Sequence, residues 1–272
     1  MQTPKSGHSF LIFFSSILVL VLVSSWTVLA LAMPSDQQQH VKWVPVEQRL
    51  DACNQKIEQQ PDNAALYAQR AYIYREQKVF DKAIADLTKA ITLDPTKRNY
   101  YFSRAAFYDL TGRTDLAVAD CTTLITMDKT KTDAYNRRSG YYKKLKNYPA
   151  ALADYDRVVA LEPDKTMGYY NRAYLYGKLQ KYDLAIADYT KIISLRKEGS
   201  KDVGGYIKRA DTYYLQKKYD LAIADCNQAL TIYPLNRNLY QLRSCAYLAK
   251  GQTGKAKADL EKILQLNRDN VY

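Results

Sequence analysis

Small, aromatic and apolar residues recur at a fixed interval through most of the chain. Aligning the segment AIAD and its variants gives six copies of one pattern, spaced 34, 34, 34, 37 and 34 residues apart. The copies begin at Ala64, Arg98, Thr132, Thr166, Val203 and Arg237. Three extra residues near the segment EGSKD account for the longer interval. A period of this length is typical of proteins in which each repeat packs against its neighbours.

Each copy, numbered from position 1 to 34, has the apolar spacing of two amphipathic helices. Position 4 is tyrosine in every copy: Tyr67, Tyr101, Tyr135, Tyr169, Tyr206 and Tyr240. Position 11 is tyrosine as well, position 8 is alanine or serine, and position 20 is alanine. Positions 4, 8 and 11 share one face of a first helix, and positions 20, 24, 27 and 28 share one face of a second. One hairpin cannot bury these faces alone, so the copies are expected to stack.

This pattern resembles the tetratricopeptide repeat family over about residues 64–270. The resemblance includes the proline at position 32 that stops a helix in three copies, Pro95, Pro163 and Pro234. It implies an all-α fold, a right-handed α-solenoid of six stacked helix hairpins. Two features depart from the family: arginine at position 7, and Arg268 in place of the last proline. Residues 47–63 match a second helix in the same register and are expected to cap the N-terminal end of the array.

Arginine at position 7 and aspartate at position 23 recur in all six copies. The pairs are Arg70 with Asp86, Arg104 with Asp120, Arg138 with Asp154, Arg172 with Asp188, Arg209 with Asp225, and Arg243 with Asp259. In an antiparallel hairpin these positions come level, so each arginine can meet the aspartate of its own or a neighbouring copy. Catalytic carboxylates work in close pairs with different environments. One charged pair per repeat instead indicates a structural ladder.

The repeats lack the residue types that most catalytic and metal sites need. Both histidines, His8 and His40, precede the first copy. The four cysteines form no CxxC motif, and Cys226 with Cys245 is the one pair in which a disulfide is an alternative to free thiols. We therefore expect no enzyme activity, no cofactor and no metal.

The N-terminal region predicts export. Residues 10–32 contain no charge, and the segment ALA at 30–32 fits a cleavage site. The apolar run is also long enough to span a bilayer. Residues 1–32 are therefore either a signal peptide or a membrane anchor, and residues 33–46 are a linker. Both alternatives place the repeats outside the cytoplasm, in the periplasm or secreted.

The chain is basic, with a formal net charge of +12, and it contains 25 tyrosines. A basic surface attracts acidic proteins, anionic lipid or nucleic acid. The same composition is also typical of a solvated, lysine-rich helix array. Because the chain is predicted to be exported, a nucleic-acid partner is not expected. The final helix has no clear extra helix to cover it, which leaves self-association open.

The family resemblance implies that a ligand binds the concave face, at positions 2, 5, 9, 12 and 13 of the first helices. The candidate residues are Tyr72, Arg75, Phe102, Asn136, Lys143, Lys144, Tyr170, Tyr174, Lys178, Ile207 and Tyr214. Aromatic side chains among cations suit an extended peptide with acidic or aromatic side chains. The leading hypothesis is a non-catalytic protein-binding scaffold or assembly factor. The alternatives are a cell-envelope carbohydrate-binding protein and a solvated groove without a preferred ligand.

Overall fold

The computed structural model describes residues 44–269, which form thirteen α-helices and no strand. The helices are α2 (Val46–Gln59), α3 (Ala64–Glu76), α4 (Phe80–Leu93), α5 (Arg98–Leu110), α6 (Thr114–Met127), α7 (Thr132–Lys144), α8 (Tyr148–Leu161), α9 (Thr166–Lys178), α10 (Tyr182–Ser194), α11 (Gly204–Leu215), α12 (Tyr219–Ile232), α13 (Arg237–Ala249) and α14 (Thr253–Asp269). The chain divides into two compact units, Met1–Arg49 and Leu50–Tyr272.

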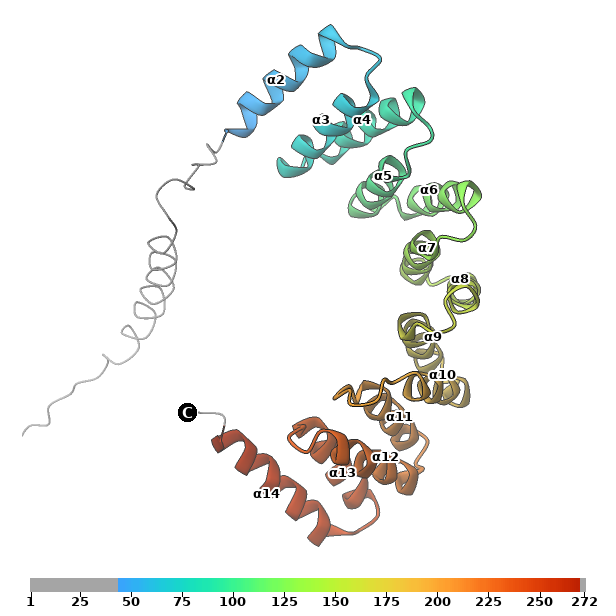
Figure 1. Cartoon of the computed structure of the whole chain (residues 1–272), viewed down its shortest axis with the longest axis vertical. Helices are drawn as coiled ribbons and strands as arrows, with labels where there is room; N and C mark the ends of the chain where they lie inside the picture. The colour runs from blue at the N-terminus through green and yellow to red at the C-terminus, as the bar shows by residue number, and fades with distance from the viewer. Residues whose placement is uncertain (1–43, 270–272) are drawn as a thin grey trace, which may run out of the picture. The chain divides into compact units, whose positions relative to one another are not determined.

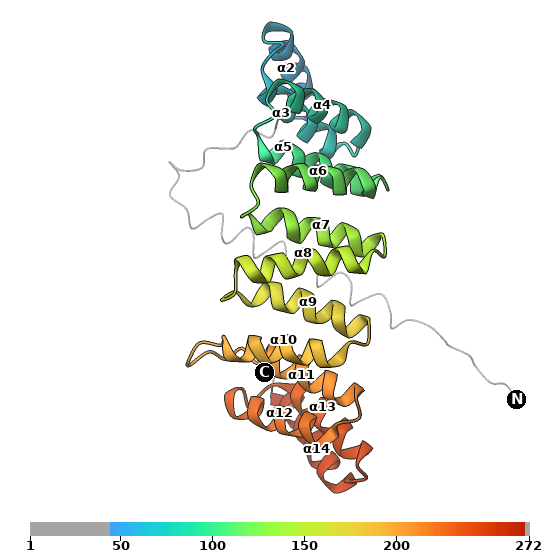
Figure 2. The same cartoon turned by 90° about the vertical axis from the view of Figure 1, so that its right-hand side faces the viewer.

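Helices α3 to α14 of the second unit pack in chain order, each against the next (Figures 1 and 2). Figure 1 shows α5, α7 and α9 on the inner side of this row, and α6, α8 and α10 on its outer side. Each hairpin therefore contributes its first helix to one face and its second helix to the other. This arrangement confirms the predicted all-α solenoid of stacked hairpins.

The turn inside every hairpin has the same backbone geometry. Position 15 adopts a positive φ in all six copies: Lys78, Gly112, Lys146, Gln180, Lys217 and Gly251. The next N–H then donates to the carbonyl of the tyrosine at position 11, as Val79 does to Tyr74 at 2.9 Å. A residue in the left-handed region, followed by an N–H that donates to the carbonyl five residues earlier, is a Schellman motif. It ends the first helix, and the second helix begins directly after it.

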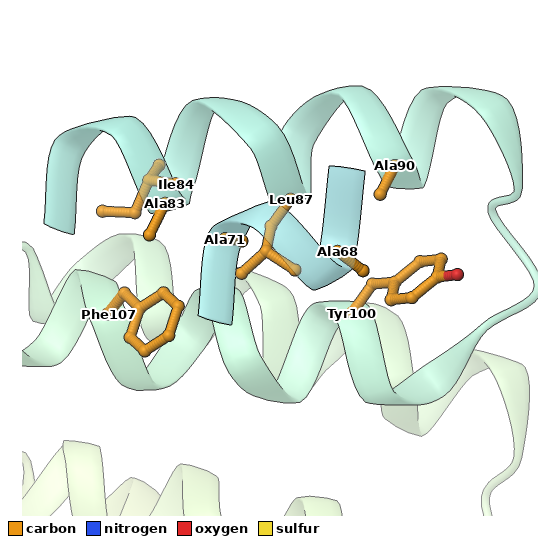
Figure 3. Close-up of a cluster of buried hydrophobic side chains, with 8 residues drawn as sticks. All are labelled: Ala68, Ala71, Ala83, Ile84, Leu87, Ala90, Tyr100 and Phe107. Atoms are coloured by element: carbon orange, nitrogen blue, oxygen red, sulfur yellow. The ribbon is translucent and has the colours of Figure 1, made fainter. Parts of the chain in front are cut away.

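The small residues at positions 8 and 20 lie where two helices of a hairpin touch. Ala71 and Ala83 are fully buried, as are their equivalents in the next four copies. In the first hairpin these two alanines share a cluster with Leu87, Tyr100 and Phe107 (Figure 3). Because Tyr100 and Phe107 come from α5, the first helix of the second copy completes the core of the first.

The predicted charge ladder forms within each copy. In all six hairpins, Nε and Nη2 of the arginine at position 7 donate to the two carboxylate oxygens of the aspartate at position 23, at 2.6–3.0 Å. For example, Arg172 pairs with Asp188, which is 4% exposed. The hydrogen bonds that Arg172 donates to this carboxylate raise the pKa of its guanidinium. The bidentate geometry offsets the desolvation of both groups.

Each arginine of the ladder also connects its copy to the helix before it. The remaining nitrogen, Nη1, donates at 2.6–3.1 Å to a side chain at position 25 of the preceding second helix: Asn54, Thr88, Thr122, Asp156, Thr190 or Asn227. The tyrosines at positions 4 and 11 lie beside the guanidinium, with ring centroids 5.4–6.0 Å from Cζ. One arginine thus joins both helices of its hairpin to the neighbouring copy.

The predicted export segment at 10–32 and all but the last three residues of the predicted linker at 33–46 lie outside the described residues. Within residues 44–269, no helix combines the length and apolar character needed to cross a bilayer. All four cysteines are free thiols, and Cys245 is half-buried while the other three are buried. The Cys226–Cys245 disulfide is therefore not formed.

Candidate functional site

A cavity of about 810 Å³ opens on the first helices of copies 2, 3 and 4. Five residues predicted from the sequence line it: Asn136, Lys143, Lys144, Tyr174 and Lys178. The structure brings these residues together from α7 and α9, and α5 supplies the opposite wall with Asp109 and Leu110. Part of the predicted groove therefore lines a single, continuous cavity.

The cavity carries an excess of positive charge. Lys144 forms an ion pair with Asp109. Arg137, Lys143 and Lys178 also line the cavity, and none of them has a carboxylate oxygen within 4.0 Å among residues 44–269. Four cations against one carboxylate leave the lining with a net charge of +3. A cleft of one sign concentrates ligands of the opposite sign.

An exposed aromatic ring lies between two of these cations. The Tyr174 side chain is 53% exposed, with Lys143 Nζ 6.0 Å and Lys178 Nζ 5.6 Å from its ring centroid. Lys143 also lies 5.7 Å from the buried ring of Tyr155, which fixes its position from below. The ring and the two ammonium groups therefore lie next to one another, with an apolar surface flanked by positive charge.

The remaining walls supply apolar contact and hydrogen-bonding groups. Leu110, which is 63% exposed, and the buried Leu175 both line the cavity. Asn136 Oδ1 is buried and has no hydrogen-bond partner within the described part of the chain. A buried acceptor without a partner is unfavourable.

Tyr141 forms the inner part of the cavity beside Arg137. Burial raises the pKa of Tyr141, and a hydrogen bond from Arg137 opposes that shift. The phenol is therefore neutral at physiological pH and offers a polar hydroxyl rather than a charge. The lining contains one carboxylate, that of Asp109, and no histidine.

The other predicted groove residues lie outside this cavity. Tyr72 shares a hydrogen bond of 2.8 Å with Ser103, and Arg75 lies 5.5 Å from the Tyr72 ring. Phe102 has the guanidinium groups of Arg98 and Arg137 at 5.5 and 5.3 Å from its ring.

In the C-terminal copies, two of the predicted tyrosines pack on neighbouring rings. Tyr170 lies 6.3 Å from Tyr189, and Tyr214 lies 5.4 Å from Tyr219, measured between ring centroids. Burial raises the pKa of Tyr170 to about 12. Ile207 lines a second cavity, formed by α11 and α13.

Sequence reasoning missed Arg137, Tyr141, Tyr148 and Leu175 as lining residues, because their positions, 6, 10 and 17, were not among those carried over from the family. It also did not select Ala106, Leu110 and Gly140, which occupy the carried-over positions 9 and 13. A signal was available at position 6, where Arg137 is a cation next to the predicted Asn136 in the sequence. The residues 44–269 contain no group of three His, Cys, Asp or Glu side chains that could hold a metal ion.

Family profiles described as "Tetratricopeptide repeat" match five segments of the chain. The matched residues are 64–97, 132–165, 168–198, 203–236 and 238–270. Together they cover more than half of the sequence and include five of the six copies. No curated protein sequence matches the chain.

Solved structures share the fold of this chain. A tetratricopeptide repeat protein from Parabacteroides merdae is 25% identical with a TM-score of 0.52, over 81% of this chain and 86% of that one. The C-terminal part of a repeat protein from Cytophaga hutchinsonii is 18% identical with a TM-score of 0.69, over 82% and 91%. YrrB, described as a TPR protein with an unusual peptide-binding site, is 17% identical with a TM-score of 0.52, over 70% and 96%.

Proposed function

The chain belongs to the tetratricopeptide repeat family, and on that premise we propose that it is a non-catalytic scaffold that binds an acidic segment of a partner protein. The segment lies extended in the cavity formed by α5, α7 and α9. The observation that carries this proposal is the exposed ring of Tyr174 among cations that have no carboxylate partner.

Each part of the cavity matches a feature of such a segment. Aspartate or glutamate side chains pair with Arg137, Lys143 and Lys178. An aromatic or aliphatic side chain lies against Tyr174 and Leu110. The peptide-binding site of YrrB, which has the same fold, makes a peptide the first class of ligand to test.

A neutral carbohydrate suits the cavity less well. The Tyr174 ring could stack on a sugar, but a sugar leaves the cations without a counter-charge. We place the binding event outside the cytoplasm because residues 10–32 have the features of a signal peptide or an anchor. Intact mass of the exported protein distinguishes these two alternatives, since cleavage after Ala32 removes those residues.

The proposal is tested with short fluorescein-labelled peptides that differ only in charge. The set contains Glu-Tyr-Glu, Gln-Tyr-Gln or Lys-Tyr-Lys in a common Gly/Ser frame, and binding is measured by fluorescence anisotropy. We expect the glutamate peptide to bind about tenfold more tightly than the glutamine peptide. High salt should reduce this advantage, because the cations are open to solvent.

Paired lysine substitutions locate the binding surface. Lys143→Gln with Lys178→Gln should weaken glutamate-peptide binding about tenfold or more. The control is Lys89→Gln with Lys191→Gln, which removes two exposed lysines from second helices and should leave binding unchanged. Equal binding of all three peptides, or retention of the protein on envelope polysaccharide alone, would contradict the proposal.

A further inference from the structure

A second cavity, of about 330 Å³, opens on the first helices of copies 5 and 6. Its lining comes from α11 and α13 and includes Asp211, Asn238, Gln241 and Cys245. These residues occupy positions 2, 5 and 9, so they belong to the same series of positions that forms the larger cavity. The second cavity therefore continues the groove into the C-terminal copies with different side chains.

Asp211 and Lys208 give the lining of this cavity no net charge, whereas the lining of the first cavity has a net charge of +3. Asp211 occupies position 9, where the other copies have Tyr72, Ala106, Gly140, Tyr174 and Cys245. The Asp211 side chain is half-buried and forms no hydrogen bond or ion pair with any of the described residues. The groove thus contains one carboxylate at position 9, and that carboxylate has no partner of its own.

The surroundings of Asp211 make it an acceptor for a cation. Burial raises its pKa, and the positive charge of Lys208 opposes that shift and favours the ionised form. Lys208 lines the cavity but its ammonium is more than 4.0 Å from the carboxylate oxygens. The side-chain amides of Asn238 and Gln241 add carbonyl oxygens that can accept from an ammonium group. A ligand cation would remove the cost of leaving the carboxylate unpaired.

We propose that the Asp211 cavity binds a lysine or arginine side chain of the same segment whose acidic part occupies the first cavity. This inference rests on the proposed function, because binding of the acidic part in the first cavity brings the basic residue of the segment close to the second cavity. The excess of cations in the first cavity and the unpaired Asp211 carboxylate in the second then fix the direction of the bound chain: acidic residues lie over α5, α7 and α9, and the basic residue lies over α11 and α13.

The test uses peptides that join a Glu-Tyr-Glu segment to one terminal residue through Gly/Ser spacers of graded length. The terminal residue is lysine or norleucine, which has a similar length and no charge. For spacers that reach the second cavity, we expect the lysine peptide to bind about tenfold more tightly than the norleucine peptide. Asp211→Asn should abolish this difference. The matched control, Asp115→Asn on the exposed surface of α6, should preserve it.

Cys245 provides a second measurement that needs no substitution. Its thiol lines the cavity and is half-buried, whereas the other three cysteines are buried. Bound lysine peptide should slow alkylation of Cys245 by iodoacetamide several-fold more than bound norleucine peptide does, as followed by mass spectrometry. If the lysine and norleucine peptides bind with equal affinity and protect Cys245 equally at every spacer length, the inference is overturned while the proposed function stands. If both peptides fail to bind, the proposed function fails, and this inference fails with it.

Discussion

The helix contact inside each hairpin has nearly the same residues in every copy, whereas the groove that the hairpins form together has residues that differ from copy to copy. At the hairpin contact, position 8 is alanine or serine, position 20 is alanine, and the arginine–aspartate pair has the same geometry in all six copies. In the groove, position 9 is tyrosine, alanine, glycine, tyrosine, aspartate and cysteine in turn. The repeated residues build the array, and the residues that differ give individual parts of the groove their chemistry.

This difference has a physical basis in what each position must satisfy. A residue at the contact between helices is surrounded in every copy by the same neighbours, so only one volume and one charge pattern fit. A groove residue faces solvent and contributes little to folding. Substitutions at contact positions should therefore change stability strongly, and substitutions in the groove should change binding with little loss of stability.

The largest expected loss of stability comes from a cavity in the core of the first hairpin. Leu87 is fully buried between α3, α4 and α5. Leu87→Ala should lower the free energy of unfolding by about 4 kcal/mol, measured by urea denaturation, because the lost contacts leave a void. Leu235→Ala serves as the control, since Leu235 is 62% exposed and should change stability by less than about 0.5 kcal/mol. Similar losses in both variants would remove the distinction between contact and surface positions.

A broken rung of the ladder should have the next largest effect. Arg172→Ala leaves the buried Asp188 without its bidentate partner and removes the connection to Asp156. We expect a loss of about 3 kcal/mol, which is at the lower end for buried pairs because the Arg172 side chain is 18% exposed. Arg157→Ala, on the exposed surface of α8, is the matched control. A variant at Arg172 with unchanged stability would show that the ladder is not structural.

A smaller effect should appear only at alkaline pH. Burial raises the pKa of Tyr189 to about 12, whereas an unfolded tyrosine titrates near about 10. The folded state favours the neutral phenol. The contribution of Tyr189 to the free energy of unfolding is therefore complete below about pH 10 and is lost as the pH rises through about 12. At about pH 11.5 the contribution has changed by about 2 kcal/mol. Tyr189→Phe should match the wild type at neutral pH.

The alkaline prediction is checked by urea denaturation at neutral pH and at about pH 11.5. The phenylalanine variant should lose about 2 kcal/mol less than the wild type between these conditions. Tyr233→Phe, at an exposed tyrosine, is the control and should follow the wild type. An identical alkaline loss in the wild type and in Tyr189→Phe would contradict the burial argument.

The sequence predicted the fold and the ladder because both depend on residues that recur. Six copies in register were enough to pair position 7 with position 23. They did not show whether Arg172 would meet the aspartate of its own copy or of a neighbour, since that depends on the turn between the helices. The structure assigns each pair to one copy and adds the hydrogen bond to the preceding helix.

The binding surface was only partly predictable because it depends on the volume of single side chains. The family resemblance gave positions 2, 5, 9, 12 and 13, and five of the eleven predicted residues meet in one cavity. Its place along the array is set by Ala106 and Gly140, two small residues at position 9 that leave room between Leu110 and Tyr174. Periodicity cannot reveal this, because the cavity exists where adjacent copies differ.

The smallest change in stability should accompany one of the clearest changes in binding. A Cβ added to Gly140 would meet no atom within 4 Å, so a larger side chain can enter the cavity without strain. Gly140→Leu should stabilise α7 by about 0.5–1 kcal/mol, because glycine inside a helix is unfavourable. The leucine should also fill the cavity and weaken glutamate-peptide binding about tenfold.

Gly254→Leu provides the matched control for this substitution. Gly254 lies on α14, where an added Cβ also meets no atom within 4 Å, and it is not part of either cavity. Peptide binding to that variant should equal binding to the wild type in the anisotropy assay. A Gly140→Leu protein that is more stable but binds the peptide more weakly would show that stability and binding depend on different properties of this groove position. Unchanged binding would mean that the cavity of α5, α7 and α9 is not where the segment docks, because a leucine cannot share that space with a ligand side chain.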